Sequence, residues 1–140
     1  MSFKEKTAWV MGAIMTVAAG YYFNMVAKAS AALGDISPPV IGFVIAYVVL
    51  VVIASVAAMI ILSIMNYREA DEPADEREKQ IIDIAGHWSN YVLAIGVIAG
   101  LFHYGVNQNG NMMFHIVFGS LMVAQIAEYG LQIWLYRRGV

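Results

Sequence analysis

The residue best placed to do chemistry is Glu128, a lone carboxylic acid inside a long apolar stretch near the C-terminus. Residues 112–136 contain no other Asp, Glu, Lys or Arg. A carboxylate this deep in a membrane helix costs about 2.5–3.5 kcal/mol on insertion scales, and such a residue usually faces an interior partner or marks an ion pathway. Gln125 and Gln132 lie at i−3 and i+4 from it, so the three side chains form one polar stripe on a helix.

A second polar stripe lies in the preceding apolar segment. Its members are spaced at i, i+4 and i+7, which places them on one helical face: Asp83, His87 and Asn90. If the two segments form an antiparallel hairpin, Glu128 faces the level of residues 89–90, and His87 lies within one turn of it. We therefore expect a contact between Glu128 and His87, with Asn90 and Gln125 completing the hydrogen bonds.

Three interpretations of this polar group are open. It binds a proton or a cation in one half of the helical bundle, or it is a buried polar network that fixes helix register and oligomer state. The third, metal catalysis, is disfavoured, because the sequence offers no nucleophile–base pair and no complete set of metal ligands. We expect no enzymatic activity.

Two further histidines, His103 and His115, lie at equal distances from the turn of the predicted hairpin. This placement allows a paired metal or haem site, although two ligands do not make a zinc site. His87 and His103 are sixteen residues apart, which rotates them by about 160° and argues against a two-haem bundle. Histidines hydrogen-bonded to backbone or water are the simpler interpretation, so we expect no cofactor.

The segment from Gly96 to Gly100 has the GxxxG pattern of membrane helices that dimerise. Small residues at this spacing let two helices approach closely. The pattern predicts a homo-oligomer whose interface includes Gly96 and Gly100. The alternative is that this face packs against the first or second helix of the same chain.

The composition indicates a membrane protein. The chain is 61% hydrophobic and 13% charged, whereas soluble domains carry roughly 25% charged residues. Its apolar runs are continuous and not alternating, which argues against a membrane barrel. A net charge of −2 and no basic tract longer than Arg137-Arg138 argue against nucleic acid. The absence of cysteine excludes disulfides and thiolate metal sites. The partner that this surface requires is the lipid bilayer.

Four apolar stretches are long enough to cross a membrane, for which about 20 residues suffice. Lipid enforces helix whatever the intrinsic propensity, because every backbone group must be satisfied internally. We therefore predict an all-α bundle of four helices in a single transmembrane domain, with spans at residues 8–27, 40–66, 81–104 and 112–136.

A charged segment, residues 68–80 (READEPADEREKQ), separates the two apolar halves and holds half of all charged residues. Seven of the eight Lys and Arg residues fall on its side of the predicted membrane, and only Lys28 falls on the other. The positive-inside rule then places both termini and this acidic loop in the cytoplasm, in a multi-pass inner-membrane protein. Ala74 or Asp75 is expected to start the third long helix.

The run Asp75-Glu76-Arg77-Glu78, followed by Ile81-Ile82 and Asn90-Tyr91-Val92-Leu93, resembles part of a group of uncharacterised small bacterial membrane proteins. In these proteins a DERE-like tetrapeptide opens the third of four helices. The resemblance covers residues 75–93, implies a prokaryotic inner-membrane protein, and brings no activity or catalytic residues. Small multidrug transporters also have four short helices, but resemblance to them implies a carboxylate in the first helix, and residues 8–27 contain none.

Two functions follow as hypotheses. The first is a small transporter or channel subunit that binds a proton or cation at Glu128. The second is a non-catalytic accessory or sensing protein whose acidic loop at residues 68–80 docks a soluble cytoplasmic partner.

Overall fold

The fold is built from four long helices. The computed structural model describes residues 1–70 and 73–138. These ranges contain α1 (Phe3–Leu33), α2 (Ile41–Met65), the single turn α3 (Tyr67–Ala70), α4 (Glu76–Asn107) and α5 (Gly110–Arg138). The helices α1, α2, α4 and α5 are each long and apolar enough to cross a membrane. The predicted all-α architecture of four membrane-spanning helices is confirmed, and each predicted span lies within one of these helices and its caps.

Hydrogen-bonded caps decide where the helices begin and end. α1 is longer than its predicted span, because Ser2 Oγ accepts a hydrogen bond from the Glu5 amide at 3.2 Å. It ends at Gly34, whose φ of 72° is left-handed and suits glycine. α4 begins after Asp75, one of the two starts predicted for it, whose Oδ1 accepts from the Glu78 amide at 2.7 Å.

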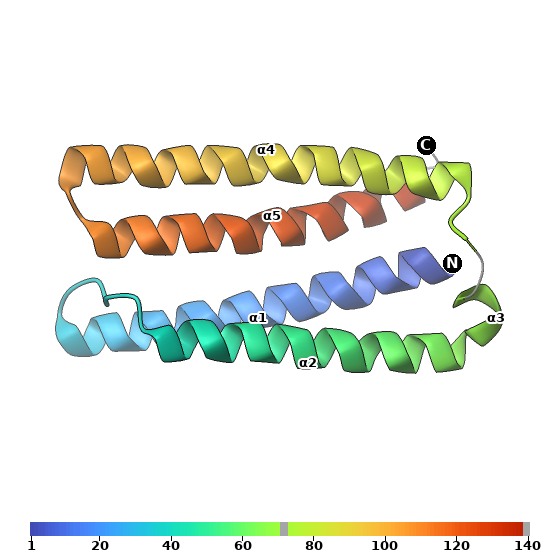
Figure 1. Ribbon diagram of the computed structural model, residues 1–140, viewed down its shortest axis with the longest axis horizontal. Coiled ribbons are helices and arrows are strands. Elements are labelled where there is room, and N and C mark those ends of the chain that lie inside the picture. Colours follow the sequence, from blue (N-terminus) through green and yellow to red (C-terminus); the bar gives the residue numbers. More distant parts are fainter. Residues whose placement is uncertain (71–72, 139–140) are drawn as a thin grey trace.

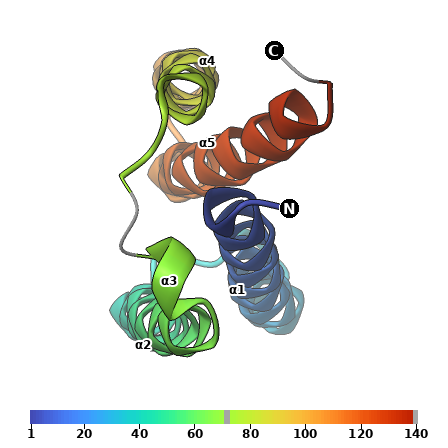
Figure 2. The ribbon, with the colours of Figure 1, turned by 90° about the vertical axis from the view of Figure 1, so that its right-hand side faces the viewer.

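The four long helices pack in a row and not in a closed square. α4 packs against α5, α5 against α1, and α1 against α2 (Figure 2). Two antiparallel hairpins, α1–α2 and α4–α5, are thereby joined through α1 and α5 (Figure 1). The inner helices α1 and α5 have neighbours on both sides, whereas α2 and α4 lie at the two ends of the row. The share of buried residues follows this order and is lowest for α2.

The two ends of the molecule differ in charge. Both termini lie at one end together with α3 and the start of α4, and the loops at residues 34–40 and 108–109 lie at the other (Figure 1). We call these the charged end and the loop end. Of the basic residues, Lys28 alone lies toward the loop end. This arrangement agrees with both termini being on one side of a membrane. That this side is the cytoplasm stays a prediction, and residues 71–72 of the predicted acidic loop lie outside the described residues.

The core lies in the loop-end half of the row, between α1, α2 and α5. Its buried members are Ala18, Ala19, Tyr22, Val26, Tyr47 and Met122. The Tyr22 ring packs edge to face against Tyr47 and Phe118, with ring centroids 6.1 and 5.0 Å apart. Tyr47 is the one buried residue of α2, whose other large side chains are largely exposed. Such a surface is solvated well by acyl chains and poorly by water.

α4 and α5 approach closely where Gly96 and Gly100 lie. A Cβ atom at Gly96 would overlap with Ser120 Cβ, and one at Gly100 would lie 2.7 Å from Val117 Cγ2. The GxxxG face is therefore filled from within the same chain. It is filled by α5, so the alternative that it packs against the first or second helix is wrong. Self-association through these two glycines is not available while α5 is in place.

Candidate proton-binding site

Glu128 lies on α5 at its interface with α4 and is half-buried. Its Oε2 accepts a hydrogen bond from Ser89 Oγ at 3.5 Å, and its Oε1 accepts one from Gln132 Nε2 at 3.4 Å. Both distances are long for hydrogen bonds to oxygen. Ser89 has a single hydroxyl proton and also lies 3.0 Å from the Gly86 carbonyl oxygen, so the carboxylate shares this donor. Glu128 is therefore positioned by its neighbours but held only weakly.

The predicted register of the α4–α5 hairpin is correct. The sequence places Glu128 at the level of residues 89–90, and the residue that meets it is Ser89. The connection between α4 and α5 is short, and Asn109 Oδ1 caps α5 by accepting a hydrogen bond from the Met112 amide at 2.9 Å. Together these constraints leave the two helices little freedom to slide along one another. The depth of each side chain in the hairpin therefore follows from its distance to this turn.

The predicted contact between Glu128 and His87 is wrong. Ser89 points toward α5, and His87 is rotated from it around α4 by roughly 160° at about 100° per residue. His87, Asp83 and Asn90 are all exposed, so the stripe that they form lies on the outer side of α4. The spacing correctly predicts that the three residues share one helical face. Spacing alone does not specify which neighbour, if any, that face meets.

Gln125, which was also expected to join the site, is exposed on α5. Among the side chains that the structure describes, Glu128 forms no ion pair. Its partners are a hydroxyl and an amide, which are neutral and bring no compensating positive charge. Such a carboxyl group has hydrogen-bond partners in both protonation states. When it is protonated, its O–H can donate to Ser89 Oγ or to the amide oxygen of Gln132.

A second polar site lies at the loop end and centres on His115 of α5, which is buried. Its Nδ1 lies 3.1 Å from the Tyr22 hydroxyl oxygen, and its Nε2 lies 2.9 Å from the Ser37 carbonyl oxygen. A carbonyl oxygen only accepts, so Nε2 carries a proton, and in the neutral ring Nδ1 accepts from the Tyr22 hydroxyl. The simpler interpretation, a histidine bonded to backbone, holds for His115.

The loop between α1 and α2 is tied to this site. The Ser37 amide donates to Ser30 Oγ at 2.9 Å, and Asn111 Nδ2 donates to the Ile36 carbonyl oxygen at 3.3 Å. The polar groups of this loop are thereby bonded to α1 on one side and to α5 on the other. No spacing in the sequence could have revealed the site, because Tyr22 and His115 are 93 positions apart.

The structure does not support a paired site at His103 and His115. His103 is half-buried and its Nδ1 lies 3.2 Å from Asn107 Nδ2, one turn along its own helix. Both ring nitrogens of His115 are bonded within the protein, so neither is left for a metal. In residues 1–70 and 73–138, no three His, Cys, Asp or Glu side chains come together in a group that could hold a metal ion.

Comparison of the chain with protein families, with curated proteins and with solved structures found no match. The resemblance to small bacterial membrane proteins with a DERE-like loop therefore stays a prediction.

Proposed function

We propose that the protein is a small membrane transport subunit in which Glu128 binds and releases a proton. The observation that carries this proposal is a half-buried carboxylate between α4 and α5, held by two long hydrogen bonds from neutral donors. Carboxylates inside membrane helices are costly and mark ion pathways or proton relays. Long, shared hydrogen bonds suit a group that changes its protonation state better than one locked into a fixed network.

A proton suits this site better than a metal cation. Calcium and magnesium ions take about six or more oxygen ligands with lone pairs directed at the ion. Around Glu128, the neighbouring Ser89 and Gln132 direct an O–H and an N–H at the carboxylate instead. Binding a proton needs only one free lone pair on the carboxylate, which these two long contacts leave available.

We propose further that copies of the protein associate through the outer face of α4. This face carries Asp83, His87 and Asn90, all exposed, on a helix at one end of the row. Asn90 lies next to Ser89 and therefore at the depth of Glu128, where an amide without partners is costly in lipid. A second copy covers the stripe and supplies hydrogen-bond partners across the interface.

Proton flux into proteoliposomes containing the purified protein tests the role of Glu128. We expect Glu128→Gln to abolish the flux, because the amide keeps the size and one acceptor oxygen of the side chain but binds no proton near neutral pH. The matched control is Asp35→Asn, which neutralises an exposed carboxylate in the loop between α1 and α2 and should leave the flux unchanged. A folded Glu128→Gln variant with unchanged flux, or a wild-type protein without flux, overturns the proposal.

Disulfide trapping in membranes tests the proposed interface, since the native chain has no cysteine. We expect Asn90→Cys to form covalent dimers on oxidation. Ile60→Cys, on the exposed surface of α2 at the other end of the row, should not. Equal trapping of both variants, or trapping through α2 alone, contradicts association through α4.

A second candidate function, docking of a soluble partner, is favoured by the exposure of Glu76, Arg77 and Lys79 at the charged end. Under this alternative, reordering residues 76–80 at constant composition abolishes complementation of a deletion strain, and Glu128→Gln does not. Proton transport predicts the opposite pattern.

A further inference from the structure

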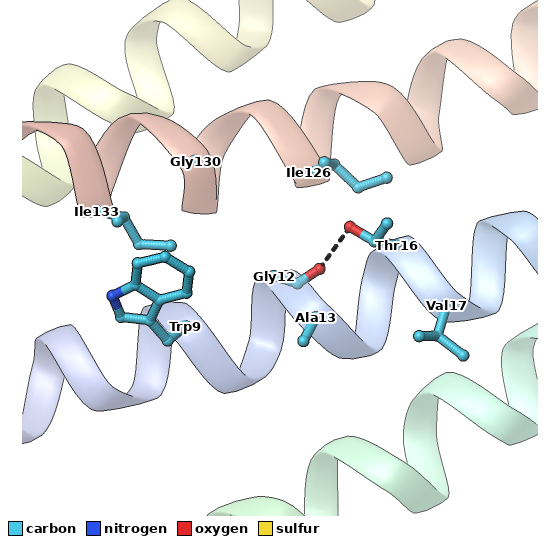
Figure 3. A pocket seen from close by; sticks show the side chains of 8 residues that line it. All are labelled: Trp9, Gly12, Ala13, Thr16, Val17, Ile126, Gly130 and Ile133. Atoms are coloured by element: carbon cyan, nitrogen blue, oxygen red, sulfur yellow. Dashed lines mark hydrogen bonds between the residues drawn. The ribbon is translucent and has the colours of Figure 1, made fainter.

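An apolar groove runs between α1 and α5 in the charged-end half of the molecule (Figure 3). It has a volume of about 400 Å³, and its walls include Trp9, Gly12, Ala13, Ile126, Gly130 and Ile133. Trp9 and Ile133 point toward one another at one end, and Thr16 and Ile126 lie toward the other (Figure 3). From Trp9 to Val17 the groove extends roughly 12 Å along α1, at about 1.5 Å per residue.

Small residues create this groove and leave it apolar. A Cβ atom at Gly130 would meet no other heavy atom within 4 Å, so the space above this glycine is unfilled. The polar groups of the lining are the Trp9 indole N–H and the Thr16 hydroxyl, and the hydroxyl donates to the Gly12 carbonyl oxygen at 2.8 Å, within its own helix (Figure 3). The walls therefore present mainly hydrocarbon, which suits an apolar occupant.

A cation lies beside the groove at its charged end. The Arg137 guanidinium carbon lies 5.1 Å from the centroid of the Trp9 ring, which itself lines the groove. The first turn of α1 and the last turn of α5 carry Lys4, Lys6, Arg137 and Arg138 against one acid, Glu5. Asp75 and Glu78 at the start of α4 lie near Tyr136, so basic residues are in excess at this end but not alone. An apolar channel that ends at guanidinium groups near the membrane surface matches a molecule with an anionic head and an apolar tail.

We propose that this groove binds an anionic phospholipid, with its phosphate at Arg137 and one acyl chain along the cleft between α1 and α5. An acyl chain gains no hydrophobic free energy by moving from the bilayer into the groove, because both surroundings are hydrocarbon. The selectivity therefore comes from the phosphate, which a guanidinium binds through charge-assisted hydrogen bonds. A second copy of the chain fits less well, since in the same membrane it presents the same basic turns at the same level.

Native mass spectrometry of the detergent-purified full-length protein, mixed with phosphatidylglycerol or phosphatidylcholine of identical acyl chains, tests this inference. We expect phosphatidylglycerol to be retained about fivefold more than phosphatidylcholine, which corresponds to the ~1 kcal/mol that one basic residue contributes near anionic lipid. Arg137→Gln should abolish that preference. Gly130→Leu should fill the groove and reduce phosphatidylglycerol retention, and Ala13→Leu should do the same from α1.

Two controls keep the test specific. Arg68→Gln removes another guanidinium at the charged end, one stacked on Tyr67 at 5.6 Å and outside the groove, and Gly105→Leu adds the same side chain at an open position on α4. Both should behave like the wild type. The inference is overturned if Arg68→Gln and Arg137→Gln reduce the preference equally, or if both groove-filling variants fold and retain lipid unchanged. It is also overturned if Gly130→Leu dissociates a dimer without changing lipid retention.

Discussion

Gly96→Ala is the sharpest test of how α4 and α5 pack. The added Cβ overlaps with Ser120 Cβ and lies 2.7 Å from Ser120 Oγ and 3.4 Å from Ser120 Cα. Rotating the serine side chain removes the contact with Oγ but not the contact with Cβ, which is fixed to the backbone. The two helices must therefore separate locally. Overpacking of this kind costs about 1–3 kcal/mol, and we expect a loss toward the upper end of this range.

The measurement is the free energy of unfolding in mixed micelles, followed by circular dichroism during titration with a denaturing detergent. The matched control, Gly105→Ala, lies on the same helix and has no heavy atom within 4 Å of the new Cβ, so its effect should stay within about 0.5 kcal/mol. Combining Gly96→Ala with Ser120→Gly removes the clashing atom. The double variant should then recover part of the loss, with a coupling of about 1–2 kcal/mol.

If Gly96→Ala unfolds like the wild type, Ser120 does not lie against Gly96. If the variant changes the oligomeric state and the double variant shows no coupling, the glycines face another copy of the chain.

Two further predictions concern the loop end and the start of α4. Replacing His115 by phenylalanine leaves the Tyr22 hydroxyl and the Ser37 carbonyl without their partner. This should lower the free energy of unfolding by about 2–4 kcal/mol in the same titration. An equal loss in His103→Phe would contradict the assignment of the buried site. Asp75→Ala removes the cap of α4 and should cost about 1 kcal/mol and speed hydrogen exchange in its first turn. Asp75→Asn keeps an acceptor oxygen and should resemble the wild type, so similar losses in both variants would contradict the capping role.

The hairpin of α4 and α5 shows how far spacing arguments reach. Counting residues from the turn placed Glu128 beside residues 89–90, and the contact with Ser89 follows that count. The rise per residue is nearly constant in a helix, so depth along the axis can be predicted from the sequence. The rotation of a polar stripe relative to neighbouring helices cannot be predicted in this way. His87 and Asn90 were expected to face α5, and they lie on the outer face of α4.

The glycine pair illustrates the same distinction. GxxxG predicts that some helix approaches closely, and the close approach at Gly96 and Gly100 is present. Which helix approaches depends on how the whole row assembles. Within a membrane, no hydrophobic force selects among apolar faces, so shape and the few polar contacts decide.

The sequence by itself determined that the chain is helical, that four stretches are long enough to cross a membrane, and at which level of the α4–α5 hairpin Glu128 lies. Length, hydropathy and the need to satisfy backbone groups in lipid leave no other solution. Only the tertiary structure decided that Glu128 meets Ser89 and not His87, that His115 joins Tyr22 to Ser37, and that a groove opens between α1 and α5. These contacts join residues far apart in the chain, and the order in which the helices pack cannot be deduced from the periodicity of any one helix.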